Sequence, residues 1–116
     1  MAKSYCEHER IRGNCAFCSP EQVFRQYRYK AKQRNLTFTL TLDEFEKITQ
    51  SACVFCGEQP ALGVDRKDSR IGYNFRNSQA CCGLCNRWKS AMIEHRFLYH
   101  ASKIAKYQEL RKQKAA

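Results

Sequence analysis

Apolar side chains recur at helical spacing after residue 19, which predicts a first helix ending near residue 34. Ser19 is expected to begin this helix, because Pro20 suits a first turn and Gln22 completes the spacing of a capping box. One side of the helix carries the apolar residues Val23, Phe24, Tyr27 and Ala31. The opposite side is basic, so this helix should pack on one face and offer cations on the other.

A second helix is predicted after the β-prone run from Thr37 to Leu40. Thr41 and Glu44 have the spacing of a capping box. The apolar stripe that follows consists of Leu42, Phe45 and Ile48. The second helix should therefore bury one narrow face.

Two strands are expected near residues 62–66 and 77–81, joined by a ten-residue loop that contains Gly72. A helix should follow from Gly83, with Leu84, Trp88 and Met92 facing inward. The tail from Glu94 to Lys112 continues the helical pattern, with a mostly apolar side that consists of Leu98, Ala101, Ile104, Ala105 and Gln108, and a basic remainder. Because the two strands are adjacent in the chain and the helices lie before and after them, this order indicates a small α+β domain.

A chain of 116 residues has room for one domain and excludes a large enzyme of several lobes. The 43% of hydrophobic residues indicates a globular protein, but eight cysteines in so short a chain point to support beyond an apolar core. The organisation that we expect has four segments in one compact unit: an N-terminal cysteine segment at 1–19, helices at 20–52, a core at 53–92 and a basic helix at 93–116.

Positive charge is concentrated in two of these segments. Lys and Arg number 21 against 11 Asp and Glu, a formal net charge of +10. Residues 86–114 contribute +6 and residues 20–34 contribute +4, which indicates a polyanionic partner such as nucleic acid. The basic residues that we expect to contact DNA are Arg25, Arg28, Lys32, Arg34, Arg70, Arg76 and Arg87.

The first fifteen residues are polar, so neither a signal peptide nor a transmembrane span is expected. We therefore expect a cytoplasmic protein that is not secreted. In a reducing compartment, paired cysteines more often hold metal than form disulfides.

Two pairs of cysteines with the spacing CxxC predict one zinc site. They are Cys53 with Cys56 and Cys82 with Cys85, and 25 residues separate the pairs. Cys81 adjoins the second pair, but only Cys82 has the CxxC spacing with Cys85. Alternation along the strand should turn Cys81 the other way.

A second zinc site is predicted near the N-terminus, from Cys6, His8, Cys15 and Cys18. Cys15 and Cys18 again form a CxxC pair, whereas the CxH half is less common. The alternative is a site of three cysteines with His8 exposed beside it. Because the metal would supply folding free energy, removal of zinc should unfold the chain.

Between and across the second zinc pair, the stretch GVDRKDSRIGYNFRNSQACCGLCNRWKS resembles the HNH, or ββα-metal, nuclease family. The resemblance implies a zinc-stabilised hairpin and helix, with flanking basic helices and the N-terminal zinc knuckle added. It also implies that Asp65 and Asn86 bind a catalytic Mg²⁺ or Mn²⁺, that Asn77 braces the loop, and that Lys89 stabilises phosphate charge. Otherwise, Asp65 would be a turn carboxylate paired with Arg66 or Lys67, and Asn86 a helix-start residue.

Arg66 departs from the usual family pattern, in which a histidine general base follows the aspartate. A guanidinium does not deprotonate in proteins, so Arg66 cannot take that role, although it can contact the phosphate. A subset of the family shares this variant, and there a loop tyrosine, here Tyr73, is implicated instead. The alternatives are that Tyr73 is a packing residue, or that His95 or His100 is the base.

The resemblance implies a metal-dependent endonuclease that hydrolyses phosphodiester bonds in double-stranded DNA. Because Arg66 replaces the usual histidine, a second interpretation is an inactive zinc-stabilised protein that binds nucleic acid. A third is a zinc-ribbon adaptor for another protein, which the charge disfavours. Cleavage of both strands would require a symmetric homodimer, and such a compact unit suits a bacterium or a phage.

Overall fold

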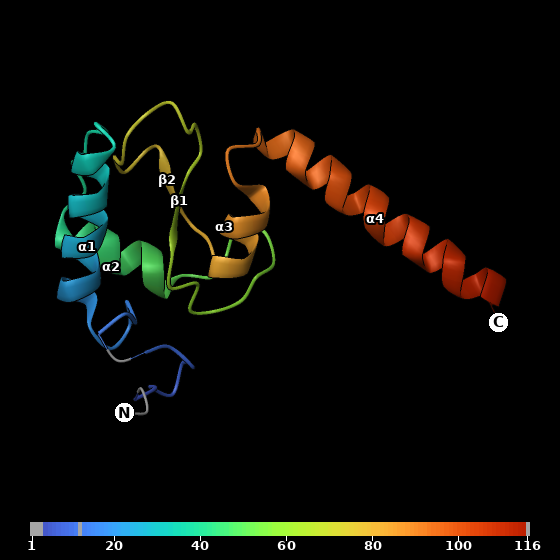
Figure 1. Cartoon of the computed structure of the whole chain (residues 1–116), viewed down its shortest axis with the longest axis horizontal. Helices are drawn as coiled ribbons and strands as arrows, with labels where there is room; N and C mark the ends of the chain where they lie inside the picture. The colour runs from blue at the N-terminus through green and yellow to red at the C-terminus, as the bar shows by residue number, and fades with distance from the viewer. Residues whose placement is uncertain (1–3, 12, 116) are drawn as a thin grey trace.

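The computed structural model describes residues 4–11 and 13–115 and has an α+β fold (Figure 1). The outer limits predicted for the first and last segments, residues 1 and 116, therefore lie outside the described residues. In chain order the elements are α1 (Pro20–Gln33), α2 (Leu42–Gln50), β1 (Val64–Arg66), β2 (Ser78–Ala80), α3 (Gly83–Lys89) and α4 (Glu94–Ala115). Helix α2 contacts α1 and both strands, while α3 follows β2 on the other side of the hairpin.

Helix α1 packs with the predicted face, but its start differs from the prediction. Val23 and Ala31 are buried, and Phe24 and Tyr27 pack against the core. Ser19 is the N-cap residue, yet its side chain makes no capping hydrogen bond. The predicted capping box with Gln22 is therefore wrong; proline in the first turn, which has no N–H to satisfy, marks this helix start instead.

Helix α2 begins with the predicted capping box. The Thr41 hydroxyl accepts a hydrogen bond from the Glu44 backbone N–H at 3.1 Å, and the Glu44 carboxylate accepts one from the Thr41 N–H at 2.9 Å. Phe45 and Ile48 are buried. This helix forms one wall of the core on which the strands lie.

The two strands form a short antiparallel hairpin, with Val64 opposite Ala80, Asp65 opposite Gln79 and Arg66 opposite Ser78. Its long loop is fastened to the segment before α2, because the Tyr73 N–H donates to the Thr37 carbonyl at 2.8 Å and the Thr39 N–H donates to the Tyr73 carbonyl at 2.8 Å. A Cβ at Gly72 would collide with the Thr37 carbonyl oxygen. Glycine at this position permits the close approach.

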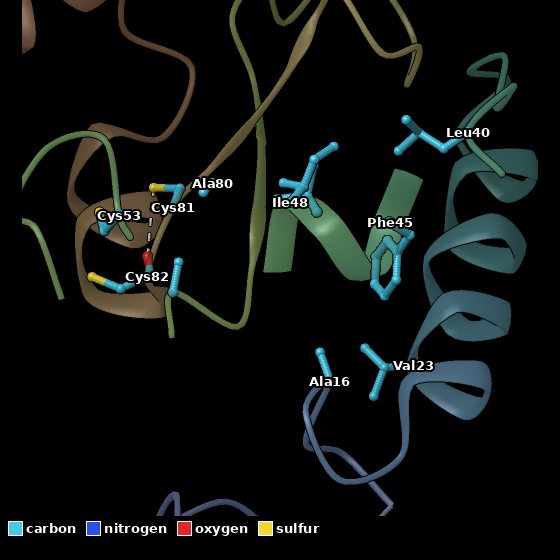
Figure 2. Close-up of a cluster of buried hydrophobic side chains, with 11 residues drawn as sticks. Ala16, Val23, Leu40, Phe45, Ile48, Cys53, Ala80, Cys81 and Cys82 are labelled. Atoms are coloured by element: carbon cyan, nitrogen blue, oxygen red, sulfur yellow. Dashed lines mark hydrogen bonds between the residues drawn. The ribbon is translucent and has the colours of Figure 1, made fainter. Parts of the chain in front are cut away.

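The core lies between α1, α2 and the hairpin, and cysteines form one end of it (Figure 2). Its buried members are Ala16, Val23, Leu40, Phe45, Ile48, Cys53, Ala61, Val64, Ala80, Cys81 and Cys82. Tyr27 packs edge-on against Phe45, with ring centroids 5.2 Å apart, and against Tyr73 at 5.9 Å. The aromatic packing thus reaches from the core to the hairpin loop.

Helix α3 presents its apolar residues to solvent, contrary to the prediction. Leu84 and Trp88 are 54% and 67% exposed, and Met92 is also exposed. The inner face of α3 carries Asn86 and Lys89 instead, three residues apart on one side of the helix. Polar contacts to β1 therefore decide which way this helix faces.

Helix α4 projects away from the rest of the chain (Figure 1). Phe97 is buried near its start, with its ring centroid 5.2 Å from that of Phe55. The predicted apolar side of the tail, including Leu98 and Ile104, is exposed. No helix within the described residues has the length and apolar character needed to cross a membrane.

Candidate functional site

The cysteine cluster at the start of α3 brings four thiols close enough to share one metal ion. The Sγ atoms of Cys53, Cys56, Cys82 and Cys85 lie within 4.8 Å of one another. The first pair is held in a tight turn, where the Gly57 N–H donates to the Cys53 carbonyl at 2.9 Å. Cys82 is the N-cap of α3. A zinc ion bound here would join the knuckle at 53–56 to the start of that helix.

The N-terminal cluster brings the four predicted ligands together. His8 Nδ1 lies 3.4 Å from the Cys18 sulfur, 3.5 Å from that of Cys15 and 3.8 Å from that of Cys6. The four ligand atoms lie within 4.8 Å of one another. His8 therefore belongs to the cluster rather than standing exposed beside three cysteines.

Cys81 lies outside both clusters, as alternation along the strand predicted. It is fully buried, and its thiol donates to the Cys82 carbonyl at 3.5 Å (Figure 2). Burial raises the pKa of the Cys81 thiol. It is a core residue next to a cluster of four cysteines that could hold a metal ion.

A cleft of about 360 Å³ opens over β1 and brings Asp65 and Asn86 to one surface. Asp65 projects from the middle of β1, and Asn86 comes from α3. The Asn86 Nδ2 donates to the Val64 carbonyl at 3.4 Å, which directs Oδ1 away from that bond. A carboxylate and an amide oxygen are the donors that Mg²⁺ and Mn²⁺ prefer, so these two residues fit a divalent cation.

The Asp65 carboxylate is also held from within the protein. Lys89 Nζ lies 3.1 Å from Asp65 Oδ2 and 3.4 Å from Oδ1, and only 1% of the Lys89 side chain is exposed. Gln79, the cross-strand partner of Asp65, donates from Nε2 to Oδ2 at 3.0 Å. Lys89 was predicted to contact the phosphate. In the structure its ammonium is instead buried against Asp65.

Arg66 and Tyr73 line the same cleft. The Arg66 guanidinium donates from Nη1 to the carbonyl oxygens of Ser69 and Ile71, the latter at 3.0 Å. Its Cζ also lies 5.4 Å from the centroid of the Tyr73 ring. Arg66 thus holds the loop and the tyrosine together at the edge of the cleft.

Asn77 is buried and hydrogen-bonded to the loop between the strands. Its Nδ2 donates to the carbonyl oxygens of Gly72 at 2.9 Å, Asp68 at 3.1 Å and Ile71 at 3.3 Å. Its Oδ1 accepts from the Asp68 N–H at 2.9 Å. These bonds hold one side of the loop that carries Tyr73.

The predicted DNA-contacting residues are all exposed, but they differ in their distance from the cleft. Arg34, just after α1, lines it, whereas Arg25, Arg28, Lys32, Arg76 and Arg87 do not. Arg70 pairs with Asp68 at 3.0 Å, and this hydrogen-bonded guanidinium lowers the pKa of the Asp68 carboxyl to about 2. No described histidine lines the cleft, and His95 and His100 lie on the projecting α4.

Two features of the site were not anticipated from the sequence. Gln79 was not singled out, although its place opposite Asp65 follows from the hairpin register. The attachment of Gly72 and Tyr73 to Thr37 was also missed, because no local pattern marks a contact between residues so far apart in the chain.

Comparisons with known proteins bear on the fold of the chain. No protein-family model matches the chain. An uncharacterized protein of Acanthamoeba polyphaga mimivirus, R423, is 32% identical over 87 residues, which are 72% of this chain; the match spans 16% of the length of that relative. Among solved structures, the rare-cutting HNH restriction endonuclease PacI is similar with a TM-score of 0.61 and 22% identity, over 94% of this chain and 87% of the other. The chain therefore has an HNH endonuclease-like fold.

Proposed function

We propose that this protein is a metal-dependent endonuclease that hydrolyses phosphodiester bonds in double-stranded DNA. The observation that carries the proposal is one cleft, on an HNH endonuclease-like fold, lined by Asp65, Arg66, Tyr73 and Asn86. This cleft brings together two oxygen donors for a cation, the guanidinium of Arg66 and the phenol of Tyr73. Phosphodiester hydrolysis needs charge stabilisation, a proton acceptor and a positioned phosphate.

Asp65 and Asn86 are proposed to hold Mg²⁺ or Mn²⁺, which when bound neutralises charge developing on the scissile phosphate. Asp65 comes from β1 and Asn86 from α3, and the zinc ion proposed for the 53–85 cluster would hold the first turn of α3. The zinc ion and the catalytic cation would therefore have separate ligands, and only the second would act on the phosphate.

Tyr73 is the proposed proton acceptor for the attacking water. In this step the water oxygen forms the new bond to phosphorus and its proton passes to the Tyr73 phenolate. The bond to the leaving oxygen breaks, and that oxygen keeps the electron pair and takes a proton from solvent water. Tyr73 lines the cleft, whereas no described histidine does. The guanidinium of Arg66 lies over its ring and places a positive charge beside it.

The DNA backbone is proposed to lie along the basic residues of α1 and α4. Arg34 lines the cleft and is placed to contact the phosphate being cleaved, while Arg25, Arg28 and Lys32 lie along the preceding helix. Arg70, Arg76 and Arg87 would contact the duplex from the hairpin loop and α3. These contacts are electrostatic and largely independent of sequence.

Incubation of the protein with supercoiled plasmid and Mg²⁺ or Mn²⁺ tests the proposal. We expect nicked or linear DNA, and a loss of rate of about 100-fold or more in Asp65→Asn and in Asn86→Ala, because the first change removes the negative charge of one proposed cation ligand and the second removes the other ligand. The matched control is Asp43→Asn, which changes an exposed carboxylate on α2 and should leave the rate intact. Circular dichroism and zinc content verify that each variant is folded.

Each outcome separates this proposal from the alternative of an inactive DNA-binding protein. DNA binding without metal-dependent cleavage would overturn the endonuclease and favour that alternative. Cleavage that persists in Asp65→Asn would overturn the assignment of the metal ligands. If the protein acts as a homodimer, linear product should form without a lag after nicking, and sedimentation should show the dimer on DNA.

A further inference from the structure

A buried lysine beside a proposed metal ligand is an unusual arrangement. The Lys89 and Asp65 side chains are 1% and 5% exposed, so both charges are removed from water. Burying an ion pair costs desolvation free energy that the attraction between the charges often does not recover, so a pair of this kind is weakly explained by stability alone. Asp65 lines the cleft, so the carboxylate that Lys89 contacts belongs to the proposed site.

The contacts on the carboxylate are unequal. Oδ2 of Asp65 accepts from Gln79 Nε2 at 3.0 Å and lies 3.1 Å from Lys89 Nζ. Among the residues that the structure describes, Oδ1 has only the longer 3.4 Å contact with the same ammonium. One oxygen is therefore saturated by two donors from inside the protein, while the other keeps acceptor capacity.

The three side chains are fixed by the elements that carry them. Gln79 faces Asp65 across the hairpin. Lys89 lies on the last turn of α3, one turn beyond Asn86 and on the same face. The residue that orients Asp65 and the second proposed ligand thus move as parts of one helix.

We propose that Lys89 is a positioning residue, which together with Gln79 occupies Oδ2 of Asp65 and leaves Oδ1 as the one carboxylate oxygen offered to a divalent cation. The inference rests on the metal site of the proposed function. A carboxylate that offers one oxygen suits Mg²⁺ and Mn²⁺, which prefer octahedral coordination. Ca²⁺ takes more oxygen ligands and often binds both oxygens of a carboxylate. Lys89 therefore sets the preference of the site for the smaller cations.

Direct metal binding to the full zinc-loaded protein tests this role without reference to cleavage. Mn²⁺ binding is followed by the electron paramagnetic resonance signal of the free ion, and Ca²⁺ binding by competition against Mn²⁺. In Lys89→Met, which keeps the length of the side chain and removes its charge, we expect the preference for Mn²⁺ over Ca²⁺ to fall about 10-fold. Lys47→Met, on the exposed side of α2, is the matched control.

A second variant covers the case in which Lys89→Met leaves Asp65 unpaired and does not fold. Gln79→Met removes the other donor to Oδ2 from a half-buried position and should shift the same preference in the same direction. An unchanged preference in the folded variants would show that Lys89 and Gln79 are structural only. An equal change in the affinities for both ions would show that Lys89 acts through its charge rather than by positioning.

Asp65→Asn separates this inference from the proposed function. If it abolishes Mn²⁺ binding while the Lys89 and Gln79 variants keep the native preference, the metal site stands and the positioning role fails. If Mn²⁺ does not bind, or binds equally in Asp65→Asn, the metal site itself is wrong and the positioning role is wrong with it.

Discussion

The Arg66 guanidinium lies 5.4 Å from the centroid of the Tyr73 ring and donates hydrogen bonds to two carbonyl oxygens of the same loop. A residue at the position usually held by a histidine base therefore binds the loop that carries the proposed replacement. The position of Tyr73 therefore depends on Arg66, because Arg66 holds the loop in place and the loop carries the tyrosine ring.

Replacement of Tyr73 with Phe should reduce the cleavage rate by about 100-fold or more, because a positioned general base contributes a factor of that order. DNA affinity measured by fluorescence anisotropy should stay within about 2-fold, since the ring and its packing against Phe38 are retained. Tyr29→Phe, which changes an exposed tyrosine on α1, should cleave normally. Normal turnover in Tyr73→Phe would remove the phenol from the chemistry.

Replacement of Gly72 with Ala should destabilise the protein by about 1–3 kcal/mol, since the added methyl group would overlap the Thr37 carbonyl oxygen. The displaced loop should also lower the cleavage rate. Thermal unfolding of the zinc-loaded protein measures the first effect. In the control Gly83→Ala, the added Cβ meets the flexible end of Arg10 at 3.3 Å, so we expect little change. Equal melting temperatures for both variants would contradict the close approach.

The two cysteine clusters should contribute unequally to activity. Cys56→Ser should lose one zinc per chain and almost all cleavage, because its cluster includes the first turn of α3, which carries Asn86. Cys18→Ser should also lose one zinc but keep part of its activity, because its cluster holds the segment before α1. Zinc content by mass spectrometry and cleavage rate measure this.

Cys81→Ala is the control for the zinc measurement. Its thiol lies outside both clusters, so the variant should retain both ions. Removal of all zinc by a chelator should abolish cooperative unfolding, since metal binding and folding are coupled in such small domains. A metal-free protein that still melts cooperatively would contradict a structural role for zinc.

Arg34→Gln should weaken both DNA binding and cleavage, because Arg34 lines the cleft. Arg25→Gln, further along α1, should weaken binding alone. Each lost phosphate contact should reduce the slope of log affinity against log salt by about 0.9. Lys47→Gln on α2 should change neither quantity. A normal cleavage rate in Arg34→Gln with saturating DNA would place this residue outside the reacting site.

Local patterns predicted the parts of this fold that depend on local chemistry. The CxxC spacings found the zinc-type clusters, and Thr41 with Glu44 marked a true helix start. The orientation of α3 was mispredicted, because apolar residues were expected to face inward. Asn86 and Lys89 at positions i and i+3 were a visible sign of a polar inner face, but their partners Val64 and Asp65 lie more than twenty residues earlier.

The sequence predicted which residues line the cleft better than it predicted what each of them does there. Asp65, Arg66, Tyr73 and Asn86 do line one cleft. The burial of Lys89 depends on how α3 docks on β1, a tertiary relationship that a charge pattern does not encode. A lysine in a basic stretch is normally a surface cation, and here the nearby carboxylate reverses that expectation.

The backbone pairing of Tyr73 with residues 37–39 bears on how this protein can be divided. A recombinant fragment beginning at residue 53 would contain the hairpin, α3 and one cysteine cluster, but it would leave Tyr73 without the strand-like partner that orients it. A fragment with only the hairpin and α3 would therefore not position Tyr73 for the proposed reaction. Transplantation of the activity into another scaffold would have to carry the segment before α2 along with it.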